Sequence, residues 1–196
     1  MIKTQRKTPA RREQIINAAR KLVIKYGSEN VTIRRIAVEV GFSEAAVYRH
    51  FKSKKDILLL LIESIENSLL SDLQACNGEN DTFTKIEDIL IRHLSSVEMR
   101  RGVAFQVIAE IVSLGDKKLN RRIFDTVDRY ISELTKILNR AQEKGQLRND
   151  LDTEAAAMIL FSVVQGLSNV WTLQNYNFDP KEKFAPILNI LKNALL

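Results

Sequence analysis

The side chains best able to do chemistry in this sequence are hydrogen-bond donors gathered within residues 43–55. They are Ser43, Tyr48, Arg49, His50, Lys52, Lys54 and Lys55. Hydroxyl, imidazole, guanidinium and ammonium groups bind phosphate oxygens, whereas the small residues between them, Ala45 and Ala46, allow close approach to base edges. The pattern therefore indicates recognition of double-stranded DNA rather than catalysis.

Two short helices joined by a tight turn are expected to position these groups. Thr32 is a good N-cap, and the apolar residues that follow it give a short helix with one apolar side. Gly41 is able to end that helix in the left-handed conformation. Ser43 then caps a second helix, in which Val47 and Phe51 face inward. This is the helix-turn-helix pattern, whose second helix enters the major groove.

A third capping signal follows at once. Ser53 is expected to cap a long helix, and Asp56, three residues later, completes a variant of the capping box. Lys52, Lys54 and Lys55 lie at this junction, just past the second short helix, where the DNA backbone would pass.

The charge of the chain is unevenly distributed. Of the 196 residues, 1–55 hold 14 Lys and Arg and four acids, a net of +10, whereas 56–196 hold 16 and 20, a net of −4. A basic head on a mildly acidic body is typical of a nucleic-acid-binding module joined to a regulatory or oligomerising body. The basic residues before Glu13 (Lys3, Arg6, Lys7, Arg11 and Arg12) are expected to form a disordered tail that aids binding through charge.

The rest of the chain predicts helices and no sheet. Apolar residues recur at helical spacing almost throughout, with stop signals at Gly27, Gly115 and Gly145 and a polar loop at 75–81 that contains the single cysteine, Cys76. Asp152 or Thr153 caps a helix to about residue 173, and a last helix runs over about 180–195. We expect an all-α protein of about nine helices, with domains at 1–55 and 56–196. The longest apolar run has six residues, so we expect no membrane span, no signal peptide and a cytoplasmic location.

Residues 11–60 resemble the DNA-binding domain of the TetR family of transcriptional regulators. The resemblance lies in Thr-x-x-x-Ile-Ala from Thr32, in Gly-Phe-Ser from Gly41, and in Val-Tyr-Arg-His-Phe-x-Ser-Lys from Val47. It implies phosphate contacts from Thr32, Tyr48, His50 and Lys54, and a base or phosphate contact from Arg34. It also places Glu44, Ala45 and Ala46 at the base-reading positions and Arg49 where members of the family differ most. Ser43 begins the same helix, and Lys52 lies just past it, beside the DNA backbone. Ala45 and Ala46 lack hydrogen-bonding groups but are able to contact a thymine methyl group.

The resemblance also implies what the body does. Members of the family dimerise through their last two long helices, so the expected interface residues here are Leu160, Val163, Val164, Leu167, Ile187 and Ile190. A pocket for a small molecule is implied within the body, with His93, Phe105, Tyr130, Phe161 and Trp171 as candidates. The implied protein is a homodimeric repressor that a hydrophobic or amphipathic effector releases from a palindromic operator.

The sequence supports other functions less well. No metal-spaced cluster, phosphate-binding glycine loop or nucleophile motif occurs, so neither catalysis nor a cofactor is expected. Residues 43–51 and 62–69 are also similar to the nucleoid-occlusion branch of the family, which acts on a protein partner while bound to DNA. A helical scaffold that has lost DNA binding is a third alternative, and the intact set of basic residues argues against it.

Overall fold

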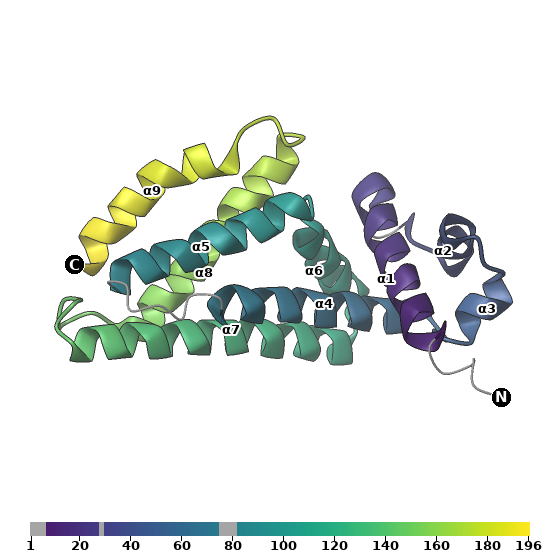
Figure 1. Ribbon diagram of the computed structural model, residues 1–196, viewed down its shortest axis with the longest axis horizontal. Helices are drawn as coiled ribbons and strands as arrows, with labels where there is room; N and C mark the ends of the chain where they lie inside the picture. The colour runs from purple at the N-terminus through teal and green to yellow at the C-terminus, as the bar shows by residue number, and fades with distance from the viewer. Residues whose placement is uncertain (1–6, 28–29, 75–81) are drawn as a thin grey trace. The chain divides into compact units, whose positions relative to one another are not determined.

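A computed structural model describes residues 7–27, 30–74 and 82–196 of the chain. Within these ranges the chain forms nine α-helices and no strand, as the sequence predicts (Figure 1). They are α1 (Lys7–Tyr26), α2 (Ile33–Val40), α3 (Glu44–Tyr48), α4 (Lys54–Gln74), α5 (Thr82–Met99), α6 (Val103–Leu114), α7 (Lys117–Glu143), α8 (Thr153–Leu173) and α9 (Pro180–Leu195). The loop expected at 75–81 and the residues Lys3 and Arg6 lie outside the described residues.

The helices form two compact units, each built from two stretches of the chain. The first unit takes in residues up to 64 together with 106–123, and the second takes in 65–105 together with 124–196. The first unit contains α1, α2, α3, the start of α4 and most of α6. The boundaries of these units lie inside α4, α6 and α7 and not at residue 55. The units therefore do not test the domains 1–55 and 56–196, which remain a prediction.

The first unit is held by a small apolar core. Ile15 and Ala19 of α1, Ile36 of α2 and Val47 of α3 are all buried, and α2 packs against both α1 and α3. The segment 106–123 adds buried residues of its own, among them Val107, Ile111 and Leu119. Burying such side chains contributes about 1.5–3 kcal/mol each, so both stretches of the chain contribute to the stability of this unit.

In the second unit, α5, α8 and α9 pack against one another. Their ends follow local sequence signals. Asp152 caps α8, because its side chain accepts from the amides of Glu154 and Ala155, and Asp179 caps α9 in the same way ahead of Pro180. The helix α8 is long and apolar enough to meet a length-and-composition test for a membrane span, with a mean hydropathy of 1.5. A core helix of a soluble protein meets the same test, and one side of α8 is buried against the bundle.

Gly102 allows the turn before α6 to lie close to the end of α8. Gly102 has φ 67°, and a Cβ atom at this position would lie 2.6 Å from Oγ1 of Thr172 on α8. Only glycine tolerates both the left-handed backbone and this approach. The turn before α6 is therefore fixed against the end of α8.

Candidate nucleic-acid interface and effector site

The backbone of residues 32–48 has the helix-turn-helix geometry that the sequence predicts. The hydroxyl of Thr32 accepts from the amide of Arg35 at 3.2 Å, and the hydroxyl of Ser43 accepts from the amide of Ala46 at 3.2 Å. Between the two helices, Gly41 has φ 69° and the Phe42 amide bonds back to the Ala37 carbonyl at 2.9 Å. Both caps and the left-handed turn are thus confirmed, and they fix the direction of α3 relative to α2.

The short helix α3 has one buried side and one exposed side. Val47 is fully buried and Phe51, just beyond the helix, is 2% exposed, as expected. Ser43, Glu44, Ala45, Tyr48 and Arg49 are exposed, and Ala46 and His50 are half-buried. Arg49 is the C-cap, and His50 lies in the turn that follows. The predicted DNA-contacting side chains between Ser43 and His50 are therefore all exposed or half-buried.

The two arginines of α2 have different surroundings. Arg35 donates to the carbonyl of Asn30 at 2.9 Å and lies over the ring of Tyr26, 5.2 Å from its centroid. Arg34 is exposed and remains the candidate for a DNA contact. Thr32, the cap of the same helix, is exposed beside it. Arg35 therefore links α2 to Asn30 and to Tyr26 at the end of α1, while Arg34 is accessible.

The start of α4 forms the expected capping box. The amides of Lys52 and Ser53 donate to Oδ2 of Asp56 at 2.7 and 3.2 Å, and the amide of Asp56 donates to the Ser53 hydroxyl at 3.4 Å. This reciprocal arrangement satisfies amides at the helix start. The side chain of Lys52 is exposed next to it.

Lys54 and Lys55 have acidic partners that the sequence did not indicate. Nζ of Lys54 lies 2.6 Å from Oε1 of Glu110 on α6, whose side chain is only 10% exposed. Lys55 pairs with Asp116, in the turn before α7. The hydrogen bond from Lys55 lowers the pKa of the Asp116 carboxyl. These partners lie 56 and 61 residues away along the chain, so local pattern could not reveal them.

One sequence prediction in this region is wrong. Arg11 and Arg12 were expected in a disordered tail, but α1 begins at Lys7 and contains both. The guanidinium of Arg11 lies 5.7 Å from the centroid of the Phe42 ring, directly before the cap of α3. Arg12 lies near Glu63 at 3.8 Å. Arg11 therefore lies beside Phe42, just before α3, so the charge that the sequence assigned to a tail is held by a helix next to the candidate DNA-binding residues.

Comparisons with known proteins agree with this geometry. Residues 15–61 match the family described as bacterial regulatory proteins of the tetR family, and residues 58–194 match the C-terminal region of YsiA-like proteins. The chain belongs to the TetR family of bacterial regulatory proteins. It is a DNA-binding transcriptional regulator and not an enzyme.

Individual relatives extend the similarity over most of the chain. The nucleoid occlusion factor SlmA of Edwardsiella ictaluri is 30% identical, covering 89% of each chain, and that of Photobacterium profundum is 29% identical, covering 94% of this chain and 95% of its own. Among solved structures, the fatty acid degradation regulator FadR of Bacillus halodurans has a TM-score of 0.81 at 21% identity, covering 91% of this chain and 93% of its own. FadR of Bacillus subtilis, solved with stearoyl-CoA, has a TM-score of 0.78 at 21% identity, covering 91% and 96%. These structures share the fold of this chain.

Three of the five predicted effector residues pack together in the second unit, and the other two lie elsewhere in it. His93, Tyr130 and Phe161 pack together, with ring centroids 5.3–6.0 Å apart, and the Tyr130 hydroxyl lies 3.3 Å from Nδ1 of His93. Trp171 is buried, and its indole N–H donates to the Phe178 carbonyl at 2.9 Å. These are contacts of a packed interior, and Phe105 is half-buried at the start of α6. Of the five, Phe161 also lines an open groove between α7 and α8.

Burial sets the protonation of His93. The side chain is 3% exposed, and this desolvation lowers its pKa from 6.5 to about 4. The imidazole is therefore neutral at physiological pH. His93 is a packing residue beside Tyr130 in this structure, rather than a cation available to an anionic ligand.

The predicted dimer residues also divide by exposure. Leu160 and Val164 are buried within the chain, so they contribute to its own core and not to a surface for a partner. Val163, Leu167 and Ile187 are half-buried, and Ile190 is 69% exposed. Val163, Leu167, Ile187 and Ile190 therefore remain as the predicted interface residues.

Proposed function

We propose that this regulator is a homodimer that binds a palindromic operator and represses transcription until a small molecule releases it. Members of the family bind DNA and small-molecule ligands as dimers. The observation that carries the proposal is the accessible surface around α3, where two caps and a glycine turn present the exposed side of the helix. One such helix reads few base pairs, so two copies related by a two-fold axis are needed for a specific site.

The proposed roles on DNA follow from residue type and exposure. Glu44, Ala45, Ala46 and Arg49, beside the cap Ser43, face base edges. The side chains proposed to bind phosphates are all exposed or half-buried. They are Thr32, Arg34, Tyr48, His50, Lys52 and Lys54. Glu44 is able to accept from a cytosine amino group, and the two alanines are able to contact thymine methyls. A site in which thymines lie opposite α3 would support this assignment.

The proposed dimer surface is one side of α8 extended by α9. Ile159, Val163, Gly166, Val170 and Leu173 recur at alternating intervals of four and three residues, which places them on one side of α8. Ile159, Val170 and Leu173 are exposed, an unusual density of apolar side chains for a helix surface. Ile187 and Ile190 provide a similar side on α9, which packs against α8.

The test is selection of operator sequences from random DNA by the purified protein at moderate salt. Enrichment of a two-fold palindrome with half-sites about one helical turn apart is expected. Salt-sensitive binding without sequence preference would contradict the proposal, because charge alone would then explain binding. Mapping the enriched sequence onto a genome would identify controlled genes and, through them, effectors to assay.

A second candidate is nucleoid occlusion, which the similarity to SlmA proteins over 89–94% of the chain favours. In that case the DNA-bound protein acts on a protein partner rather than on promoters. Chromatin immunoprecipitation separates the two functions. A few sites at promoters support the repressor, whereas many sites spread over the chromosome support nucleoid occlusion. Either function places the protein in the cytoplasm with the nucleoid.

A further inference from the structure

The first turns of α7 carry an unusual concentration of positive charge. Residues 117–122 hold four Lys and Arg and no acid, although residues 56–196 as a whole hold more acids than bases, 20 against 16. All six residues belong to the first unit, which also contains the helix-turn-helix. This basic segment and the recognition helix α3 are therefore parts of one compact unit.

Helix stability does not account for the charge at the start of α7. The N-terminal end of a helix carries a partial positive charge, so cations in the first turn destabilise the helix and acids stabilise it. The first turn of α7 contains no acid. Asp116, just before the helix, provides a cap, because its Oδ1 accepts from the amides of Lys118 and Leu119 at 3.1 Å. Residues that break a local rule of this kind occur mainly where function requires them.

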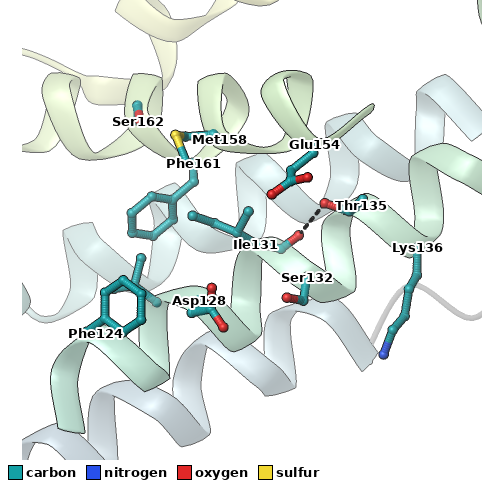
Figure 2. Close-up of a pocket in the computed structure, with 11 residues that line it drawn as sticks. Phe124, Asp128, Ile131, Ser132, Thr135, Lys136, Glu154, Met158, Phe161 and Ser162 are labelled. Carbon is teal, nitrogen blue, oxygen red and sulfur yellow. Dashed lines mark hydrogen bonds between the residues drawn. The ribbon is translucent and has the colours of Figure 1, made fainter. Parts of the chain in front are cut away.

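Lys117 and Lys118 are accessible to a partner. Both side chains are exposed, and neither forms an ion pair within the part of the chain that the structure describes. By contrast, Lys136 further along the helix (Figure 2) has its Nζ 2.7 Å from Oε1 of Glu133. Leu119 is buried and fixes the side of α7 that faces the core. The two lysines therefore lie in solvent with their charges unmatched.

An ion pair places the start of α7 beside the start of α4. Oδ2 of Asp116 accepts from Nζ of Lys55, the second residue of α4. The same carboxylate caps α7 directly before Lys117, so it joins the two helix starts. The exposed Lys52 precedes α4 at this junction. Lys117 and Lys118 therefore continue the cations at the start of α4 onto a second helix.

We propose that Lys117 and Lys118 bind DNA phosphates next to those bound at the start of α4. This contact depends on charge and not on base sequence, because the lysines meet the backbone alone. An anionic membrane is another polyanion that attracts lysines. The ion pair with Lys55 connects the two lysines to the unit that carries α3, which favours DNA over a membrane.

Salt dependence measures the proposed contact. Lys117→Ala/Lys118→Ala should lower the slope of log affinity against log salt by about 0.9 for each lysine removed, counted per chain bound. At roughly 0.15 M salt this corresponds to about thirtyfold weaker binding per chain, equally on a selected operator and on a random duplex. Lys117→Arg/Lys118→Arg retains both charges and should keep the slope of the parent chain. Fluorescence anisotropy over a salt series measures all three proteins.

Lys144→Ala/Lys183→Ala is the matched control. Both lysines are exposed and belong to the second unit, and removing them changes the net charge by the same amount. The slope should equal that of the parent chain, because only cations that neutralise phosphates release counterions. Thermal unfolding checks the fold. The midpoint of Lys117→Ala/Lys118→Ala should be unchanged or higher, and a lower midpoint would mean that the lysines serve the stability of α7 instead.

Neutral methylphosphonate linkages, placed one at a time in the duplex, locate the contact. At phosphates bound by the two lysines they should weaken binding of the parent chain and leave Lys117→Ala/Lys118→Ala unaffected. An unchanged slope in this variant, or an equal loss in the control pair, would overturn the inference. Loss of binding to phosphatidylglycerol vesicles with an unchanged slope on DNA would assign the lysines to a membrane surface instead.

The inference rests on the proposed function only in taking α3 and the start of α4 as the DNA-binding face. A random duplex suffices to compare the slopes. Failure of the operator selection would therefore refute the palindrome-binding repressor and leave the phosphate contact standing. Selection of a palindrome by the parent chain, together with an unchanged slope in Lys117→Ala/Lys118→Ala, would refute this inference alone.

Discussion

At the scale of single residues, the pairing of Lys54 with Glu110 matters most for DNA binding. The ammonium group has a carboxylate 2.6 Å away in the absence of DNA. A phosphate would have to replace this carboxylate, so the two anions compete for one cation. Residue type alone predicts that Lys54 binds a phosphate. The structure adds that Lys54 must lose its ion pair with Glu110 to do so.

The competition predicts opposite effects for the two partners. Lys54→Ala should weaken binding to all DNA sequences alike and reduce the slope of log affinity against log salt by about 1. Glu110→Gln should instead strengthen binding by roughly two- to fivefold, because a weak, partly exposed ion pair no longer holds the lysine. Fluorescence anisotropy over a salt series measures both. Lys85→Ala, a substitution in the second unit, is the control, and an unchanged slope in Lys54→Ala would remove Lys54 from the interface.

A second prediction at this scale concerns His93 and acid. Its pKa is about 4 when folded and 6.5 when unfolded, so the unfolded chain binds the proton first as the pH falls. Stability should therefore be unaffected above pH 6.5 and decline below it, by about 2 kcal/mol at pH 5. Urea unfolding at pH 7, 6 and 5 measures the decline. His93→Gln should flatten it, whatever its effect on stability at pH 7, and an equally steep decline in this variant would assign the effect to other groups.

At the scale of elements, the chain's caps were predictable and its long-range pairs were not. Thr32, Gly41, Ser43 and Asp152 act on backbone groups within a few residues, so their roles follow from local sequence. Pairs such as Lys54 with Glu110 join residues far apart in the chain, and only the packed fold reveals them.

The helix α8 illustrates a different limit of sequence analysis. Because α8 is apolar on most sides, the spacing of its apolar residues does not show which of them face the core. Leu160 and Val164 were therefore assigned to a partner surface although they are buried within the chain. Likewise His93, Tyr130 and Phe161 are aromatic at helical spacing whether they line a pocket or fill a core, and here they pack on one another.

Gly166 provides a prediction for this element. A Cβ atom there would meet nothing within 4 Å in the chain, so glycine is not required by the fold of one copy. Gly166→Ala should stabilise the isolated helix by up to about 1 kcal/mol, yet weaken dimerisation if the backbones of two α8 helices approach each other at this point. Sedimentation equilibrium measures the dissociation constant of the dimer.

Two further variants serve as a disrupting substitution and a control for the measurement of dimerisation. Val163→Asp, on the same side of α8, should give monomers with unchanged helicity. Ser113→Asp, at an exposed position on α6, should leave the mass unchanged. A dimer as tight in Gly166→Ala as in the parent chain would show that the glycine has no role at the interface.

At the scale of the whole molecule, the two-fold symmetry of a dimer constrains its DNA site. Both recognition helices read the same face of the duplex only when the half-sites are about one turn, or a multiple of it, apart. Inserting about five base pairs between the selected half-sites should therefore reduce affinity to that of a single half-site, and inserting about ten should partly restore it. Gel-shift titration measures this, and indifference to the insertions would indicate binding by independent monomers.

The discontinuous first unit has a consequence for modular engineering. Residues 106–123 contribute buried side chains and the partners of Lys54 and Lys55 to the unit that carries the helix-turn-helix. A transplant of residues 1–64 into a related regulator would leave those partners behind and expose apolar surface to a foreign segment. A chimera designed to exchange operator preference while keeping effector response therefore has to include both residues 1–64 and residues 106–123 of this chain. The remainder of its body comes from the regulator whose effector response is kept.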